Sequence, residues 1–236
     1  MQTAKSIVIS CAGIGSRLGL ATTKALVEIE GMSVIARQLQ SLQRVDDIRV
    51  VVGYQAGDVI AEVRRYRPDA VFCYNHDYFT TKTGASFFLG ARHGNEYAIE
   101  LDGDLLVHPD DMRMLLEQPG EWIAYADISS DDAMFVRVDG EGNVLSFSSE
   151  SGDYEWTGPA CIRKDRLRYS SGHVFNMLEP SLPMRGIKIR ACDIDTYDDY
   201  MRAAKFVRSW QERKIHESSD FGGRVSADGE RPAQHH

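Results

Sequence analysis

Short apolar runs alternate with amphipathic stretches through the first half of this 236-residue chain. Four runs are rich in β-branched or aromatic residues and bounded by polar turns, as buried strands are: Ile7–Ile9, Ile48–Val52, Val71–Tyr74 and Tyr97–Leu101. Three stretches between them carry apolar residues at helical spacing: Ser33–Val45, Gly57–Tyr66 and Thr83–Arg92. Because strands that alternate with helices pair in parallel, the pattern predicts an α/β fold, a mostly parallel sheet with helices on both faces.

The second half of the chain has a different pattern. Three segments resemble antiparallel strands, the last two joined by a turn at residues 139–143: Trp122–Ala126, Ala133–Val138 and Val144–Phe147. A strand, a helix, a strand and a closing helix are expected next: Glu155–Ile162, Asp165–Leu178, Ile187–Cys192 and Tyr197–Arg213. We therefore expect one domain over residues 1–215, with a small antiparallel insertion at about 121–162. Residues 216–236 lose apolar content and are expected to form a flexible tail, whose last four residues resemble an expression-tag remnant.

A glycine-rich loop, CAGIGSRLGLATTK at residues 11–24, follows the first expected strand. Glycines let main-chain N–H groups approach phosphate oxygens closely, and Arg17 and Lys24 add positive charge. The spacing excludes the dinucleotide fingerprint, which needs a third glycine where Leu18 stands, and the P-loop, which needs Ser or Thr after the lysine. The loop predicts a polyphosphate site of another kind; a turn that only links two strands is the alternative.

The pattern G-x-G-x-R-x-G, followed by Thr-Lys-Ala-Leu at residues 23–26, resembles the signature loop of the sugar-phosphate nucleotidyltransferase superfamily. The chain departs from that signature at Cys11, where alanine is usual, and at Thr23, where proline is usual. The resemblance covers residues 5–205 and implies a Rossmann-like three-layer fold of the nucleotide-diphospho-sugar transferase type. It implies that Arg17 and Lys24 are catalytic and hold the triphosphate. Backbone donors to the phosphates are expected at Ala12, Gly13, Gly15 and Ser16.

Two aspartates separated by glycine, Asp102 and Asp104, end the fourth expected strand. Carboxylates supply the hard oxygen ligands that Mg²⁺ takes together with substrate phosphates. The resemblance implies that Asp104 binds the catalytic metal and is itself catalytic, and that Asp102 lies beside the nucleotide. A plain β-turn at the Asp-Gly pair is the alternative. Ligands collect at the carboxyl ends of parallel strands, so this turn and the glycine loop are expected to meet in one cleft.

A second acidic segment, residues 193–199, precedes the final expected helix. Asp193 and Asp195 alternate along an extended stretch and so point the same way. Superfamily members often carry a metal-binding acid just before such a helix, which implies that these two complete the Mg²⁺ site of Asp104. Asp198 and Asp199 fall in the first helical turn, where negative charge suits the helix dipole.

The segment from Tyr74 to Ser86 narrows the resemblance to cytidylyltransferases that act on phosphocholine and related phosphate or phosphonate acceptors. That branch carries an Asn and a Tyr before a Ser at this spacing, which implies CTP as the donor and Tyr74, Asn75 and Ser86 as nucleotide ligands. The branch usually has asparagine where this chain has Lys82-Thr83. A choline cage is also incomplete, because Met134 stands where a tryptophan is expected.

The acceptor stays open among phosphonates, amino-alcohol phosphates and polyol or sugar phosphates. The residues expected on the acceptor side are Lys82, Trp156, Arg163 and Lys188, with Arg190 as a further candidate. For each cation the alternative is an ordinary surface charge, and for Trp156 it is a core aromatic.

Composition excludes several classes of partner. Acidic residues outnumber basic ones, 35 to 27, and the formal net charge of −8 argues against nucleic acid. The four cysteines are scattered without metal-binding spacing, which favours a reduced, cytoplasmic protein. No signal segment and no apolar stretch of about 18 residues is present, so a membrane partner is not expected. The sequence leaves the oligomeric state open, a homodimer included.

The expected reaction is transfer of CMP from CTP to a small phosphate or phosphonate acceptor, with release of pyrophosphate. One alternative is an NTP:sugar-1-phosphate nucleotidyltransferase that uses another base. Another is a glycosyltransferase of related fold, because Asp102-Gly103-Asp104 is also a D-x-D motif. A nucleotide-binding module without catalysis is the third.

Overall fold

The computed structural model describes residues 4–15, 22–129 and 133–222, with the side chains of the last helix described as far as Trp210. A ten-stranded sheet runs through this part of the chain in the order β11-β9-β10-β13-β8-β12-β6-β1-β4-β5. Its strands, in chain order, are β1 (Lys5–Cys11), β4 (Asp47–Val52), β5 (Val71–Tyr74), β6 (Tyr97–Asp102), β8 (Trp122–Tyr125), β9 (Phe135–Val138), β10 (Asn143–Ser148), β11 (Tyr154–Glu155), β12 (Ala160–Arg163) and β13 (Met184–Lys188).

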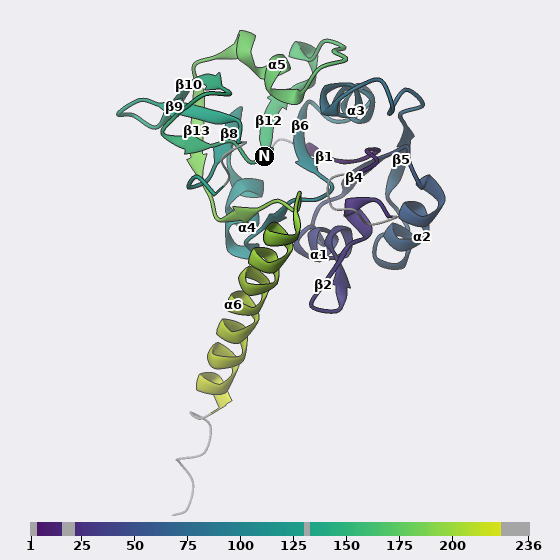
Figure 1. Cartoon of the computed structure of the whole chain (residues 1–236), viewed down its shortest axis with the longest axis vertical. Coiled ribbons are helices and arrows are strands. Elements are labelled where there is room, and N and C mark those ends of the chain that lie inside the picture. The colour runs from purple at the N-terminus through teal and green to yellow at the C-terminus, as the bar shows by residue number, and fades with distance from the viewer. Residues whose placement is uncertain (1–3, 16–21, 130–132, 223–236) are drawn as a thin grey trace, which may run out of the picture.

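Helices cover both faces of the parallel part of the sheet, as Figure 1 shows. The helices are α1 (Val34–Ser41), α2 (Ala56–Tyr66), α3 (Thr83–Ala91), α4 (Pro109–Glu117), α5 (Val174–Leu178) and α6 (Tyr197–Gly222). Side chains of β1 alternate between two cores: Ile7 and Ile9 pack with α1, α2 and α4, whereas Val8 packs with α3 and α5. This arrangement is the three-layer α/β fold that the sequence predicts.

A third core attaches the last helix to the body. Val207 and Trp210 of α6 pack with Ile29 and Leu106, beside two short ladders, β2 (Glu28–Ile29) with β3 (Met32–Ser33) and β7 (Leu106–Val107) with β14 (Ala191–Cys192). Figure 1 shows α6 running away from the body. None of the helices in the described ranges is long and apolar enough to cross a membrane.

The strand order reverses at β1. From β1 the chain moves outward to β4 and β5 on one side, and it returns to place β6 on the other side, with all four strands parallel. In α/β sheets ligands bind at such a switch point, outside the carboxyl ends of the strands. The fold therefore brings the loop after β1 and the turn after β6 together, as the sequence predicts.

The antiparallel strands of the expected insertion are present, and they extend the main sheet. β12 pairs antiparallel with β6, and β8 pairs with β12 and, in parallel, with β13. The single strand expected over Glu155–Ile162 is two strands, β11 and β12. Pro159, which has no N–H for a ladder, lies between them.

Other boundaries also differ from the sequence-based expectation. The helix expected over Asp165–Leu178 is a 3-10 turn at Lys164–Arg166 followed by an irregular segment and the short α5. The strand expected over Ile187–Cys192 divides into the end of β13 and β14, and α6 continues past Arg213 to Gly222. The sequence analysis missed α4, although Pro109 at its first position and two acids in its first turn are helix-start signals.

Candidate active site

A cavity of about 330 Å³ lies at the carboxyl ends of β1 and β6. Its volume is at the low end of the range for small-molecule sites. It is lined by these residues of the predicted site: Ala12, Gly13, Gly15, Lys24, Asn75, Lys82, Ser86, Asp102 and Asp104. Ser16 and Arg17, which the sequence places on the same loop, lie outside the described residues.

The two loops approach so closely that glycine is needed at their contact. The Gly103 N–H donates to the carbonyl of Ser10 at 3.0 Å. A Cβ at position 103 would lie 2.8 Å from both that carbonyl oxygen and Cys11 Sγ. From the other side, the Gln38 amide donates to the carbonyls of Asp102 and Leu105, at 2.7 and 2.6 Å. These bonds fix the turn that carries Asp104.

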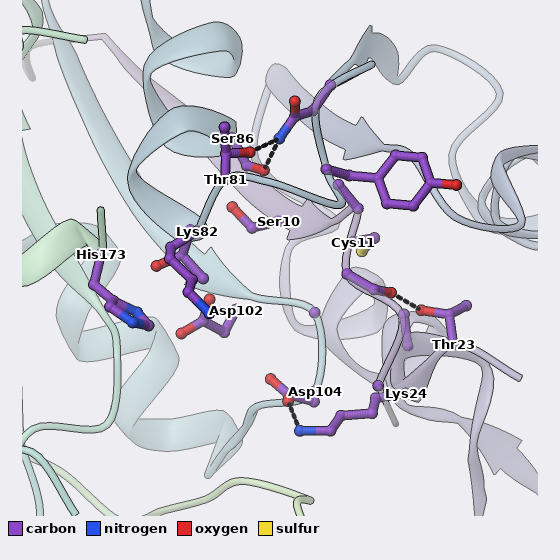
Figure 2. A pocket seen from close by; sticks show the side chains of 18 residues that line it. Ser10, Cys11, Thr23, Lys24, Thr81, Lys82, Ser86, Asp102, Asp104 and His173 are labelled. Atoms are coloured by element: carbon purple, nitrogen blue, oxygen red, sulfur yellow. Dashed lines mark hydrogen bonds and ion pairs between the residues drawn. The ribbon is translucent and has the colours of Figure 1, made fainter. Parts of the chain in front are cut away.

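Lys24 connects the glycine loop to the acidic residues (Figure 2). Its ammonium lies 2.8 Å from Asp104 Oδ2 and also forms an ion pair with Asp195 Oδ1. Only 13% of the Lys24 side chain is exposed. Burial favours a lower pKa for Lys24, but the charges and hydrogen bonds of Asp104 and Asp195 outweigh burial and raise it. Two carboxylates from distant parts of the chain thus share one cation.

Gly15 permits this position of Lys24. Gly15 has a φ of +66°, and a Cβ there would lie 2.8 Å from Lys24 Cγ. The lysine belongs to a single 3-10 turn, Lys24–Leu26, whose Ala25 is buried in the core. Backbone conformation and packing together aim the ammonium at the carboxylates.

The carboxylates here fit a divalent cation in part. Asp104 and Asp195 converge on one positive charge, and Mg²⁺ commonly takes one or two carboxylates and fills its other positions with substrate phosphates and water. The described residues contain no group of three His, Cys, Asp or Glu side chains with metal-binding geometry. Burial, followed by the charges of Asp104 and Asp195, raises the pKa of Asp193 to about 7. Asp193 therefore keeps a proton more readily than an ordinary aspartate beside the negatively charged pair.

The final acidic segment divides between Asp195, which pairs with Lys24 and is not itself among the residues that line the cavity, and Asp199, which lies at the start of α6. Asp199 accepts hydrogen bonds from Thr196 N at 2.7 Å and from Thr196 Oγ1 at 2.8 Å, and it also pairs with Arg202. It therefore closes the first turn of α6 and holds the chain that presents Asp195, whose N–H it also accepts at 3.2 Å.

Asp102 and Glu100 form a second, more deeply buried acidic pair on β6. Burial, and then the charge of Asp104, raises the pKa of Asp102 to about 7. Burial, and then Asp102, raises the pKa of Glu100 well above its ordinary value. Neither carboxyl oxygen of Glu100 has a hydrogen-bond donor among the described residues. Two carboxyl groups in such a site retain a proton, which makes the pair a poor place for a second free negative charge.

The predicted nucleotide segment is organised by Asn75. Its amide donates to Thr81 Oγ1 and Ser86 Oγ, both at 3.1 Å, and its side chain is 3% exposed. Asn75 therefore holds the loop between β5 and α3 against the cavity. Tyr74 does not line the cavity; it is 51% exposed and stacks on His76, and Tyr78 lines the cavity in its place.

Of the predicted acceptor residues, only Lys82 lines the cavity. Arg163 pairs with Asp165 at 2.6 Å on a different surface, and Lys188 pairs with Asp127 at 2.6 Å and lies over the Tyr154 ring. Arg190 pairs with Asp111. Trp156 packs against Phe147 and Phe175, with ring centroids 5.4 and 6.0 Å away, as a core aromatic does.

The cavity also contains residues that the sequence analysis missed: Thr23, Tyr78, Thr81, Thr83 and His173. Thr81 and Thr83 are the sequence neighbours of Lys82, so they could have been predicted as site residues together with it. His173 fell inside an expected helix, and no local signal marked it.

Comparison with known proteins agrees with this geometry. Residues 7–168 match the sequence model of the family described as the MobA-like NTP transferase domain. A search of curated proteins by sequence finds no match. HddC from Yersinia pseudotuberculosis has a similar structure, with a TM-score of 0.70 and 17% identity over 86% of this chain and 99% of that one.

Two other solved structures are similar to this chain. CTP:phosphocholine cytidylyltransferase from Streptococcus pneumoniae has a TM-score of 0.68 and 18% identity, covering 86% of this chain and 99% of that one. The inositol-1-phosphate CTP transferase from T. maritima has a TM-score of 0.72 and 16% identity, covering 84% and 93%. The structural likeness establishes the fold, and the family match covers most of the chain. This chain therefore belongs to the MobA-like NTP transferase family of nucleotidyltransferases.

Proposed function

We propose that this protein transfers CMP from CTP to a small phosphate or phosphonate acceptor and releases pyrophosphate. The observation that carries the proposal is the contact of Lys24 with Asp104 and Asp195. It joins the end of the glycine loop to two acids from distant parts of the chain, and Lys24 and Asp104 both line the cavity. An acceptor oxygen forms a bond to the α-phosphorus, and the bond from that phosphorus to the bridging oxygen of the leaving pyrophosphate breaks.

The chain's own residues bind and align the reactants in this reaction. Backbone donors at Gly13 and Gly15, with Arg17 and Lys24, hold the triphosphate. Asn75 and Ser86, which line the cavity, are assigned to the side that receives the base. A phosphate acceptor has its second pKa at about 6 and is largely ionised at neutral pH. No side chain therefore has to remove a proton from it, and catalysis rests on alignment and charge neutralisation.

Mg²⁺ is the proposed cofactor, held by Asp104 and Asp195, with Asp193 beside them. When bound, such an ion neutralises charge on the phosphate oxygens. Lys24 occupies the same two carboxylates in the structure. The lysine is therefore placed to pass from the carboxylates to the phosphates when both substrate and ion are present.

The choice of CTP rests on the Tyr74–Ser86 segment, and two of the similar structures are named as CTP-using enzymes. A sugar-1-phosphate nucleotidyltransferase that uses another base is the second candidate, since the loop that holds the triphosphate does not read the base. The D-x-D motif at Asp102-Gly103-Asp104 also suggests a glycosyltransferase, but the family match disfavours that activity.

The test is a matrix of four NTPs against phosphocholine, aminoalkylphosphonates, polyol phosphates and sugar phosphates, read by pyrophosphate release. We expect CTP with one acceptor class to give metal-dependent turnover that EDTA abolishes. Pyrophosphate release with UTP, ATP or GTP, but not with CTP, would show that the donor nucleotide carries another base. Consumption of a nucleotide sugar without pyrophosphate would overturn the reaction class.

A further inference from the structure

Residues 171–174, which precede and begin α5, are attached to the start of α3 by three hydrogen bonds. The Lys82 N–H donates to the Ser171 carbonyl at 2.9 Å, and the Gly84 N–H donates to the Gly172 carbonyl at 3.0 Å. The Val174 N–H donates to Thr83 Oγ1 at 3.3 Å. Two segments about 90 residues apart in sequence are thus held in fixed register at the edge of the cavity.

This attachment brings two basic side chains to the same side of the cavity. Lys82 and His173 line it together with Lys24 and Asp104. Figure 2 shows His173 and Lys82 on one side and Thr23, from the end of the glycine loop, on the other. The His173 ring stacks on Phe175, with ring centroids 5.5 Å apart and an angle of 10° between the ring planes.

Neither of these two side chains has an acidic partner among the residues that the structure describes. Among the residues that the structure describes, the Lys82 ammonium has neither an ion-pair partner nor a side-chain hydrogen bond, whereas Lys24, Arg163 and Lys188 each pair with an aspartate. Burial, and then the Lys82 charge, lowers the pKa of His173. An anion bound between the two would offset this repulsion and accept hydrogen bonds from both.

We propose that Lys82 and His173 together bind the phosphate or phosphonate group of the acceptor. The proposal rests on the proposed function and assigns one cationic site to each reactant. Lys24 and the glycine loop hold the donor's triphosphate, and Lys82 with His173 hold the acceptor's anionic group. The hydrogen bonds between residues 171–174 and α3 then set the spacing of the acceptor site.

The kinetic test compares Lys82→Met, His173→Gln and the double variant with wild type. Losing a charge-assisted hydrogen bond is expected to raise the acceptor KM by about 10- to 100-fold in each single variant. The KM for CTP is expected to stay within about twofold, since the donor is held elsewhere. Lys82→Arg, which keeps the charge, is expected to recover most of the acceptor affinity.

Two exposed bases outside the cavity supply matched controls, Lys205→Met on α6 and His93→Gln after α3. Both controls should leave the two KM values unchanged. A rise in the CTP KM with an unchanged acceptor KM would assign Lys82 and His173 to the donor and overturn the proposal. Unchanged values for both substrates would overturn it as well.

A binding measurement decides the proposal even if no acceptor in the matrix reacts. Methylphosphonate is the probe, titrated into the protein with a non-hydrolysable CTP analogue while the ring-proton NMR signal of His173 is followed. We expect the signal to shift in a saturable way and the His173 pKa to rise, and we expect Lys82→Met to weaken this binding by about tenfold or more. A His173 signal that methylphosphonate does not move would contradict the acceptor site. Absence of pyrophosphate release across the matrix would contradict only the proposed reaction.

Discussion

Two lysines line one cavity in opposite electrostatic states. Lys24 is 13% exposed and engaged by Asp104 and Asp195, whereas Lys82 is exposed and unpaired within the described part of the chain. On the Lys24 side, the lysine ammonium is already paired with two carboxylates in the absence of substrate. The Lys82 side presents positive charge, beside His173, without a counter-charge. Under the proposed function, this difference assigns the donor and the metal to the Lys24 side and the acceptor to the more open Lys82 side.

The largest expected effect comes from breaking the Lys24 side. Lys24→Ala and Asp104→Ala should each lower kcat/KM by about a hundredfold or more, because each removes a preorganised charge from the site. Pyrophosphate release at saturating and limiting CTP measures this loss, with Lys205→Ala as the matched control. Near-normal turnover in either variant would contradict the assignment of these residues.

A smaller effect, of opposite sign, is expected for metal binding without nucleotide. Because Lys24 shares the carboxylates of Asp104 and Asp195, Lys24→Met should raise the affinity for Mn²⁺ by about tenfold, or about 1.4 kcal/mol. Electron paramagnetic resonance of free Mn²⁺ measures the affinity, and Asp195→Asn should weaken it. Equal Mn²⁺ affinity in wild type and Lys24→Met would show that lysine and ion do not compete.

The buried acid behind the cavity gives a pH-dependent effect on stability. The pKa of Glu100 is higher in the folded protein than its ordinary value, so the folded chain keeps a proton that the unfolded chain loses. The free energy of unfolding should therefore fall as the pH rises from the ordinary Glu pKa towards the folded one, by at most about 1.4 kcal/mol per pH unit.

Glu100→Gln should reduce this dependence, while Asp102 and Asp193, with pKa values of about 7, retain part of it. The variant should be more stable than wild type at pH 8 by about 1 kcal/mol. Urea unfolding at pH 5, 6.5 and 8 measures both proteins, with Glu117→Gln as a control on α4. Parallel curves for wild type and Glu100→Gln would mean that Glu100 is not held protonated.

The smallest effects are expected for the cations that the structure places outside the cavity. Arg163→Met and Lys188→Met remove exposed ion pairs with Asp165 and Asp127. Such pairs are worth about 0–1 kcal/mol, so stability and the acceptor KM should change little. A large rise in the acceptor KM for Lys188→Met would move the acceptor site towards Tyr154 and away from His173.

The parallel half of the fold and the meeting of Lys24 with Asp104 could be predicted because their signals are local. Residues 5–11 alternate between two cores, and Lys24 and Asp104 stand in motifs whose spacing is set by their own loops. The acceptor side depends on contacts between distant segments. Pairing of Ser171 and Gly172 with the start of α3 replaces the expected helix and carries His173 to the cavity.

The directions in which individual side chains point could not be predicted from the sequence either. Trp156 and Tyr74 have the right residue types for ligand contact, but Trp156 is taken up by Phe147 and Phe175, and Tyr74 faces out to stack on His76. Only packing against neighbours on other elements decides such choices.

The proposed reaction transfers CMP from CTP to a small phosphate or phosphonate acceptor in the cavity that Lys24 and Asp104 line. ³¹P NMR of CTP incubated with the protein, Mg²⁺ and the acceptor panel tests it directly. We expect pyrophosphate and a CMP–acceptor anhydride, which is CDP-linked for a phosphate acceptor and CMP-linked for a phosphonate, to appear together in equal amounts, and we expect Asp104→Ala to yield neither. Unchanged CTP with every acceptor, or hydrolysis to inorganic phosphate without such an anhydride, would contradict the proposed reaction.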